Sequence, residues 1–92
     1  MKILWDENKA ASNLKKHRGI SFDEAKTCLL DPVALDMEDP DADGERRYIL
    51  IGMSTLQRLL TICYSMPDGE TYRIISARKP TKNEEIAYAK GI

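Results

Sequence analysis

Three β-rich runs follow one another in the second half of the chain, and they constrain the fold more than any other feature. RRYILIG begins at Arg46, LLTICYS at Leu59 and TYRIISA at Thr71. The last two runs are separated by a short turn that contains Asp68-Gly69, a pair typical of β-hairpins. Because strands joined in this way pair antiparallel, the sequence predicts a sheet in this half of the chain.

A strand and a helix are predicted before this sheet. KILW, close to the N-terminus, reads as a short strand, and Asp6 stands where a helix N-cap is expected. The helix that follows is predicted over residues 7–17. Ala10, Leu14 and His17 lie at a spacing that places them along one stripe, which we expect to be buried.

A second helix follows after a short connection. SFDE, from Ser21 to Glu24, has the spacing of a capping box, in which the two side chains cap each other's backbone amides. The buried stripe predicted for this helix consists of Phe22, Ala25, Cys28 and Leu29.

The remaining segments complete an α+β pattern. VALDM, from Val33, is a candidate strand, and the acidic EDPDADGE is a loop. Thr81 and Glu84 have the spacing of a second capping box at the start of a C-terminal helix. The order β-α-α-β-β-β-β-α predicts one domain over residues 1–92, with helices mainly on one face of an antiparallel sheet. A chain of this length buries a single small core.

Several classes of protein are disfavoured by composition. No apolar run is long enough to cross a membrane and no signal segment is evident, so we expect a cytoplasmic protein. Cys28 and Cys63 each lie in an apolar pattern and are expected to be small core residues rather than disulfide partners. His17 is the one histidine, so no Cys/His cluster is formed, and we expect neither a metal site nor a cofactor.

Charge is distributed unevenly along a chain whose net charge is −1. Residues 21–45 contain nine acidic side chains and one basic one, whereas residues 1–20 and 71–92 each contain five basic and two acidic ones. If the two basic ends meet in space, they could bind phosphate groups, because phosphate affinity depends on local charge. Two alternatives stay open: an ordinary mixed surface, and an acidic stretch from Asp36 to Glu45 that meets a basic protein.

Five short motifs occur in sequence along the chain. They are WDENKAASNLKKH, GISFDEA, DP, GERRYILIG and RIISARKPTKNE, and together they cover nearly its whole length. Each motif alone is weak, but this order and spacing resemble the BrnT family of bacterial type II toxins. One departure is KHRG, where the family's usual KHG has no arginine between the histidine and the glycine.

The resemblance implies a RelE-like fold, with two N-terminal helices and one C-terminal helix on an antiparallel sheet. It implies an RNA endonuclease toxin that inhibits translation, and we expect the cleavage to be metal-independent. It also implies a BrnA-like antitoxin that neutralises the toxin and, together with it, binds operator DNA. The alternative from another class is a non-catalytic module of the same fold that binds protein or nucleic acid.

The segment RIISAR ends a strand with arginines that match the family motif. Strict alternation would place Arg78 on the face that carries Tyr72 and Ser76, and Arg73 on the other face. Metal-free RNA cleavage needs cations around the phosphorane-like transition state, and a planar guanidinium suits a phosphate. We therefore expect both arginines to be catalytic. The alternative for each is a salt bridge to the acidic loop.

His17 belongs to the residue type that changes its protonation near neutral pH, so it is the expected general acid or base. The alternative is a histidine packed at a helix end. Lys15 and Lys16 precede it, and we expect both to bind RNA and Lys16 also to act in catalysis. Their alternative is a solvated helix end that the helix dipole favours.

Further candidates lie near the strands. Glu45 and Arg47, in GERRY, match family positions. Two roles compete for Glu45, namely general base and partner of an arginine. Arg47 and Lys79 are expected to contact RNA phosphates. Tyr64 could donate to a phosphate or stack on a base, with a half-buried strand aromatic as its alternative.

Overall fold

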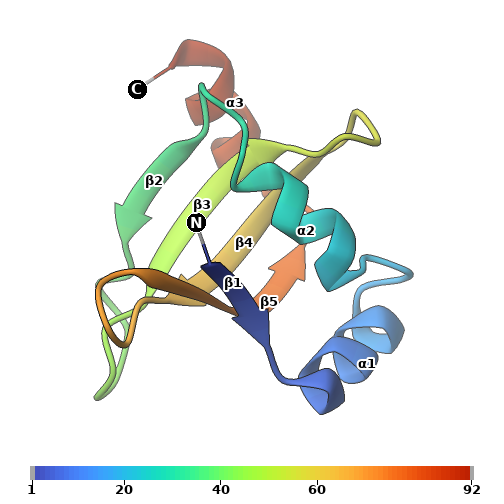
Figure 1. Cartoon of the computed structure of the whole chain (residues 1–92). Coiled ribbons are helices and arrows are strands. Elements are labelled where there is room, and N and C mark those ends of the chain that lie inside the picture. The colour runs from blue at the N-terminus through green and yellow to red at the C-terminus, as the bar shows by residue number, and fades with distance from the viewer. Residues whose placement is uncertain (1, 92) are drawn as a thin grey trace.

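A five-stranded sheet forms the centre of the computed structural model, which describes residues 2–91 (Figure 1). The strands are β1 (Lys2–Trp5), β2 (Leu35–Glu38), β3 (Tyr48–Met53), β4 (Leu59–Ser65) and β5 (Thr71–Arg78). The helices are α1 (Glu7–Lys16), α2 (Phe22–Cys28) and α3 (Lys82–Lys90). The predicted α+β class and element order are confirmed.

The sheet is mixed, which corrects the prediction of a wholly antiparallel one. Its strand order is β1-β5-β4-β3-β2, and β1 runs parallel to β5, with Lys2 opposite Thr71 and Trp5 opposite Ile74. The other neighbours are antiparallel. Local patterns predict hairpins, but β1 and β5 are joined through the rest of the chain, and such a long connection permits a parallel pair.

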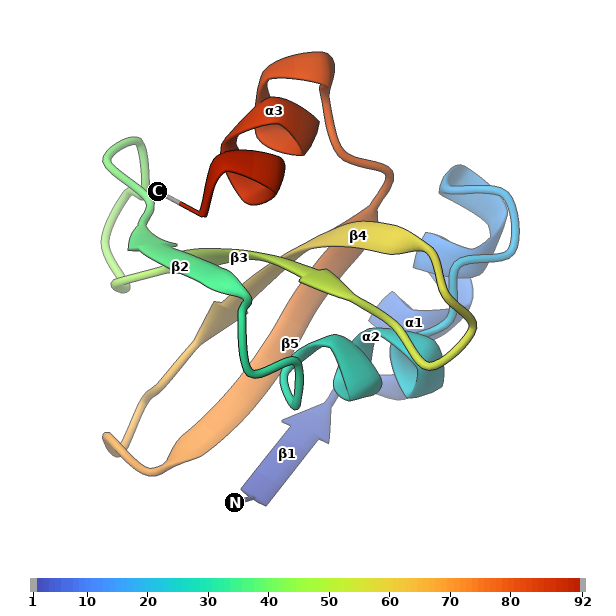
Figure 2. The same ribbon diagram turned by 90° about the horizontal axis from the view of Figure 1, so that it is seen from above.

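The helices lie on both faces of the sheet (Figure 2). On one face, α2 packs against β3, β4 and β5, whereas α3 lies over the opposite face. The stripe predicted for α2 is confirmed, since Phe22, Ala25, Cys28 and Leu29 are all buried. They pack against the strand residues Leu50, Leu60, Ile62, Ile74 and Ala77. In the described part of the chain, no helix is long and apolar enough to cross a membrane.

A β-bulge interrupts the pairing of β4 with β5. Cys63 lies opposite Ser76 and Tyr64 lies opposite Ile74, so Ile75 is an extra residue on β5. A bulge of this kind reverses the side-chain alternation of the strand that carries it.

The bulge brings the two arginines of β5 to the same face of the sheet, so the prediction from strict alternation is wrong. Arg73 lies opposite Ser65 and Arg78 opposite Thr61, and these two positions on β4 point the same way. That face is the one opposite α2.

A side chain completes the free edge of β5. β1 pairs only as far as Ile74, and beyond it the Asn13 amide takes the place of a neighbouring strand. Asn13 Oδ1 accepts from the Ala77 backbone N–H at 3.1 Å, and Asn13 Nδ2 donates to the Ala77 carbonyl at 2.9 Å and to the Ile20 carbonyl at 3.1 Å. These buried bonds fix α1 against the edge of the sheet.

The inward face of α1 differs from the predicted stripe. Ala10 packs against the core and His17 is half-buried, but Leu14 is 44% exposed and Asn13 takes the buried position. The reason is the location of α1 beside a strand edge, where unpaired backbone groups need a polar partner rather than an aliphatic one.

The first predicted capping box is only half formed. Ser21 Oγ accepts from the Glu24 N–H at 3.0 Å, as expected. The Glu24 carboxylate, however, turns away to the β3–β4 turn, where it accepts from Arg58 Nε at 2.7 Å and from Ser54 Oγ at 2.7 Å. The bond from Arg58 lowers the pKa of Glu24 despite its burial, so this carboxylate is ionised.

The second capping box is confirmed, and its glutamate also ties α3 to the sheet. Thr81 and Glu84 cap each other reciprocally. Glu84 accepts from Arg78 Nη1 at 2.9 Å and Nη2 at 3.1 Å, and from Thr61 Oγ1 at 3.0 Å. Helix α3 has no fully buried residue, so it is attached mainly through such polar contacts. A second one joins Tyr88 Oη to Asp31 at 2.6 Å.

Replacing Asn13 should destabilise the fold. In Asn13→Ala, the Ala77 N–H and two carbonyls lose their partners, which should lower the free energy of unfolding by roughly 2–3 kcal/mol. Urea unfolding measures the change. Ser12→Ala, which alters an exposed neighbour on the same helix, is the control. An Asn13→Ala midpoint equal to that of the wild type would contradict this role.

Stability should also depend on the ionisation of Glu84. Burial alone would raise its pKa from 4.5, but hydrogen bonds from Arg78, Thr81 and Thr61 prevail and lower it to about 2. A lowered folded-state pKa stabilises the fold above pH 4.5, and this contribution is lost as the pH falls toward 2. Glu84→Gln should therefore be less stable than the wild type at about pH 7, and the difference should shrink at about pH 3. Glu85→Gln, one residue on and exposed, should show no such pattern in urea unfolding.

Candidate active site

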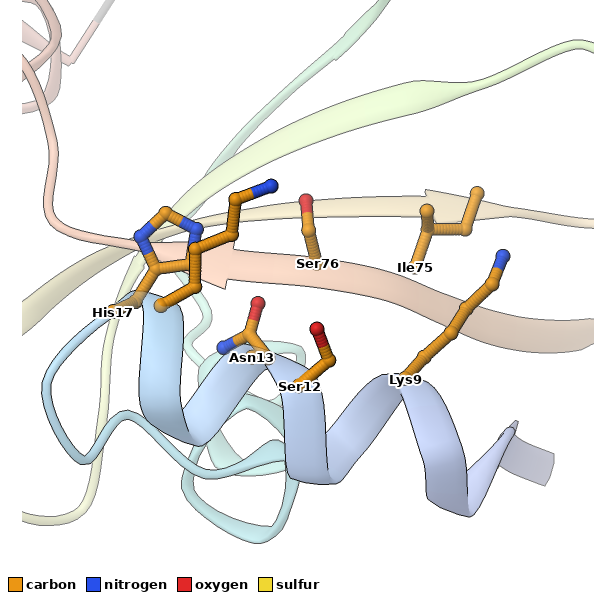
Figure 3. A pocket seen from close by; sticks show the side chains of 7 residues that line it. Lys9, Ser12, Asn13, His17, Ile75 and Ser76 are labelled. Carbon is orange, nitrogen blue, oxygen red and sulfur yellow. The ribbon is translucent and has the colours of Figure 1, made fainter.

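A cavity of about 230 Å³ lies between α1 and the C-terminal half of β5 (Figure 3). The residues that line it are Lys9, Ser12, Asn13, Lys16 and His17 from α1 and its end, and Ile75 and Ser76 from the bulged part of β5. Asn13 holds the two elements together, so the cavity is a direct result of the way in which the edge of β5 is completed.

Two further cavities continue this one in both directions. A cavity of about 300 Å³ is lined by Lys16, His17, Arg18 and Lys79. On the other side, a cavity of about 110 Å³ is lined by Asp6, Lys9, Arg73 and Ile74. Lys16 and His17 line both the first and the second cavity, and Lys9 lines both the first and the third. The three cavities therefore form one continuous surface. We call it the basic groove and define it by Arg73, Lys9, Lys16, His17, Arg18 and Lys79.

Most cations of the basic groove are free to bind an anion. Among residues 2–91, no carboxylate lies within 4 Å of the charged nitrogens of Lys9, Lys16, Arg18 or Lys79. Asp6 is the one acidic lining residue, and its Oδ1 already accepts from two backbone N–H groups of α1. The groove therefore concentrates positive charge, of which only the part at Arg73 is paired with a described carboxylate.

Local structure explains why these side chains converge. Lys9 and Lys16 are seven residues apart, which places them on the same side of α1. His17 is the C-cap of the helix, and Arg18 and Gly19 follow with φ of 46° and 84° and reverse the chain. The additional Arg18 is accommodated in this turn, while the half-buried His17 faces the groove.

Arg73, at one end of the groove, pairs with Glu45 from the loop before β3. Arg73 Nη2 donates to the two carboxylate oxygens at 2.8 and 2.7 Å. The pKa of Glu45 is lowered, first by the nearby Ser65 hydroxyl and then by the Arg73 guanidinium. Ser65 Oγ itself is buried and forms no hydrogen bond of good geometry with a described residue, so the pair with Arg73 is the firmer contact.

Arg47 lies close to this pair. Its charge also contributes to lowering the pKa of Glu45. Arg47 Nε is buried and has no hydrogen-bond partner among the described residues. The structure thus brings Glu45, Arg47 and Arg73 together, and Arg73 forms the salt bridge to the acidic stretch that was its alternative role.

Three predicted site residues, one catalytic and two RNA-binding, have other surroundings. The Arg78 guanidinium is bound by Glu84 of α3. It is therefore neither a free cation for a phosphate nor paired with the acidic loop. Tyr64 is 2% exposed and its hydroxyl donates to Asp36, which leaves no face on which a base could stack and corrects that prediction. Lys15 is exposed and lines none of the three cavities.

The structure adds Lys9 and Ser76 to the candidates. Lys9 joins the Arg73 end of the groove to the His17 end, and Ser76 faces the cavity from β5. The seven-residue spacing from Lys9 to Lys16 was a usable signal in the sequence. Ser76 had none, because its position depends on the bulge.

Comparisons with known proteins agree on one family. The sequence model of the family described as "Ribonuclease toxin, BrnT, of type II toxin-antitoxin system" matches residues 5–84. The crystal structure of the Brucella abortus ribonuclease toxin BrnT superimposes with a TM-score of 0.65 at 25% identity, covering 89% of this chain and 99% of that one. No curated protein sequence matches.

The family match spans most of the chain, and the solved toxin shares the α+β architecture with its mixed sheet. A basic groove beside a sheet edge is a surface suited to RNA, which carries one negative charge per phosphate. The chain therefore belongs to the BrnT family of ribonuclease toxins of type II toxin-antitoxin systems.

Proposed function

We propose that this ribonuclease toxin binds the RNA backbone along the basic groove, cleaves it without a metal ion and thereby inhibits translation in the cytoplasm. The observation that carries the proposal is the continuous row of cations around His17, in which Lys9, Lys16, Arg18 and Lys79 have no carboxylate within 4 Å in the described part of the chain. Such a row can follow successive phosphates of a single strand and also place one phosphate beside a titratable group.

Cleavage at a ribose 2′-OH needs a base for the hydroxyl proton, cations for the phosphorane-like transition state and an acid for the 5′-oxygen. An imidazole can accept or donate a proton between about pH 5 and 8. His17 has the position for this role, because Lys16 flanks it in two cavities and Lys79 faces it in one.

Glu45 suits the role of general base less well. Its carboxylate is held ionised by its surroundings and its pKa is lowered, which weakens it as a proton acceptor. It also pairs with Arg73 at the end of the groove away from His17. We therefore propose that Glu45 orients Arg73 and that Arg73, with Arg47 beside it, binds a phosphate next to the one that is cleaved.

The partners follow from family membership. A type II toxin has a protein antitoxin, and its substrate here is RNA. We propose that the antitoxin is BrnA-like and that operator DNA is bound only through the complex of toxin and antitoxin. A non-catalytic binding module of the same fold is the competing function, and the two differ in whether bound RNA is cut.

His17→Gln should separate catalysis from binding. Because glutamine preserves polar packing but cannot exchange a proton near neutral pH, cleavage of an RNA oligonucleotide should fall by roughly 10²- to 10⁴-fold. RNA affinity should change little. Glu45→Gln is the matched comparison, and a larger loss of cleavage in it than in His17→Gln would make Glu45 the base.

Salt dependence should identify the cations that contact phosphate. Four contacts on single-stranded RNA predict a slope of log affinity against log salt near −3, about −0.7 for each contact. Lys9→Gln/Lys16→Gln should reduce the slope by about 1.4, whereas Lys15→Gln, outside the groove, should not change it. An equal effect of Lys15→Gln would show that general charge, and not the groove, binds the RNA. Strong binding by a wild type that leaves RNA intact would favour the non-catalytic module.

A further inference from the structure

A second groove lies on the face of the sheet that carries α2, next to the edge strand β2. Its volume is about 320 Å³. Tyr48, Tyr64 and Tyr72, from three neighbouring strands, form its floor, and Asp36 and Glu38 from β2 line its rim. We call these five residues the tyrosine groove.

The three tyrosines form a row of rings across the sheet. The centroids of Tyr48 and Tyr64 are 5.4 Å apart with the rings stacked, and those of Tyr64 and Tyr72 are 5.1 Å apart with the rings tilted. Tyr64 is buried, while Tyr48 and Tyr72 are only half-buried. The two outer rings are therefore the aromatic surface that a ligand could reach.

The carboxylates at the rim have no strong cationic partner. Asp36 accepts from the Tyr64 hydroxyl at 2.8 and 2.6 Å, and among residues 2–91 no cation lies within 4 Å of it. Burial, followed by the bond to Asp36, raises the pKa of Tyr64, so its hydroxyl stays a donor. Glu38 approaches Arg46 only at 3.8 Å, and both side chains are more than half exposed, so this pair is weak.

The chemistry of the tyrosine groove suits a cation and disfavours RNA. Uncompensated carboxylates repel phosphate, and the segment around them contains nine acidic side chains and one basic one over residues 21–45. The face of an aromatic ring attracts an ammonium or guanidinium group, more strongly where water is excluded. A lysine or arginine side chain of a partner protein therefore suits this groove, because it can contact an aromatic ring and pair with the carboxylates of the rim at the same time.

We propose that the tyrosine groove binds a basic segment of the antitoxin, with one arginine or lysine side chain placed against Tyr48 or Tyr72 and paired with Asp36 and Glu38. The proposal rests on the assignment of this chain to a type II system for the existence of that partner. The groove and the arginines of β5 lie on opposite faces of the sheet. A partner can thus bind in the tyrosine groove without contacting the basic groove.

Asp36→Asn/Glu38→Gln tests the charge of the rim. The asparagine introduced in place of Asp36 would keep an acceptor for the Tyr64 hydroxyl, so the fold should survive, and equal melting temperatures would verify this. The Kd for the purified cognate antitoxin, measured by calorimetry, should rise about 10- to 100-fold, as expected for losing one or two charge-assisted contacts. Asp23→Asn/Glu85→Gln, which removes two exposed carboxylates elsewhere, is the matched control and should leave the Kd unchanged.

Tyr48→Leu tests the rings independently of charge, because leucine keeps an apolar contact but removes the aromatic face. It should also weaken antitoxin binding. Wild-type affinity in both groove variants, or an equal loss in the control, would overturn the proposal. RNA cleavage should stay at the wild-type rate in Asp36→Asn/Glu38→Gln. Loss of RNA binding in Asp36→Asn/Glu38→Gln would show that RNA, and not the antitoxin, occupies the tyrosine groove. Absence of RNA cleavage in the wild type and in every variant would contradict the proposed nuclease activity but would leave the antitoxin-binding result unaffected.

Discussion

The edge of β5 is the constraint on which the rest of the structure depends. β1 provides four residues against a strand of eight, so half of the edge of β5 needs another partner. The Asn13 amide binds the N–H and the carbonyl of Ala77 in that half and so fixes α1 alongside β5. Since α1 carries Lys9 and Lys16 and ends at His17, the same contact that completes the sheet also assembles the basic groove.

Much of the fold was predictable because its signals are local. The β-rich runs, the Asp68-Gly69 turn and the buried stripe of α2 depend on residues close together in sequence, and the structure confirms them. The parallel pairing of β1, the bulge at Ile75 and the buried position of Asn13 depend on contacts between distant segments. Neither periodicity nor helix propensity reports such contacts, so these features were missed.

The candidate site shows the same division. The sequence indicated the residue types, and the structure brings Lys16, His17 and Lys79 together in the lining of one cavity. What could not be predicted is how each charge is compensated. Arg78 is bound by Glu84 and Arg73 by Glu45, 6 and 28 residues away, respectively. A pattern of cations in a sequence therefore identifies candidates, but the nearby carboxylates decide which cations stay free.

The order of the strands also separates charge in space. The basic groove runs along β5 and α1 at one edge of the sheet, and Asp36 and Glu38 of β2 lie at the other edge. Charges of opposite sign thus lie at the two edges of a molecule whose net charge is only −1, and this separation is an electric dipole across the sheet. In the field of a polyanion, this dipole turns the β5 edge forward before contact and speeds productive encounter, an advantage that added salt removes.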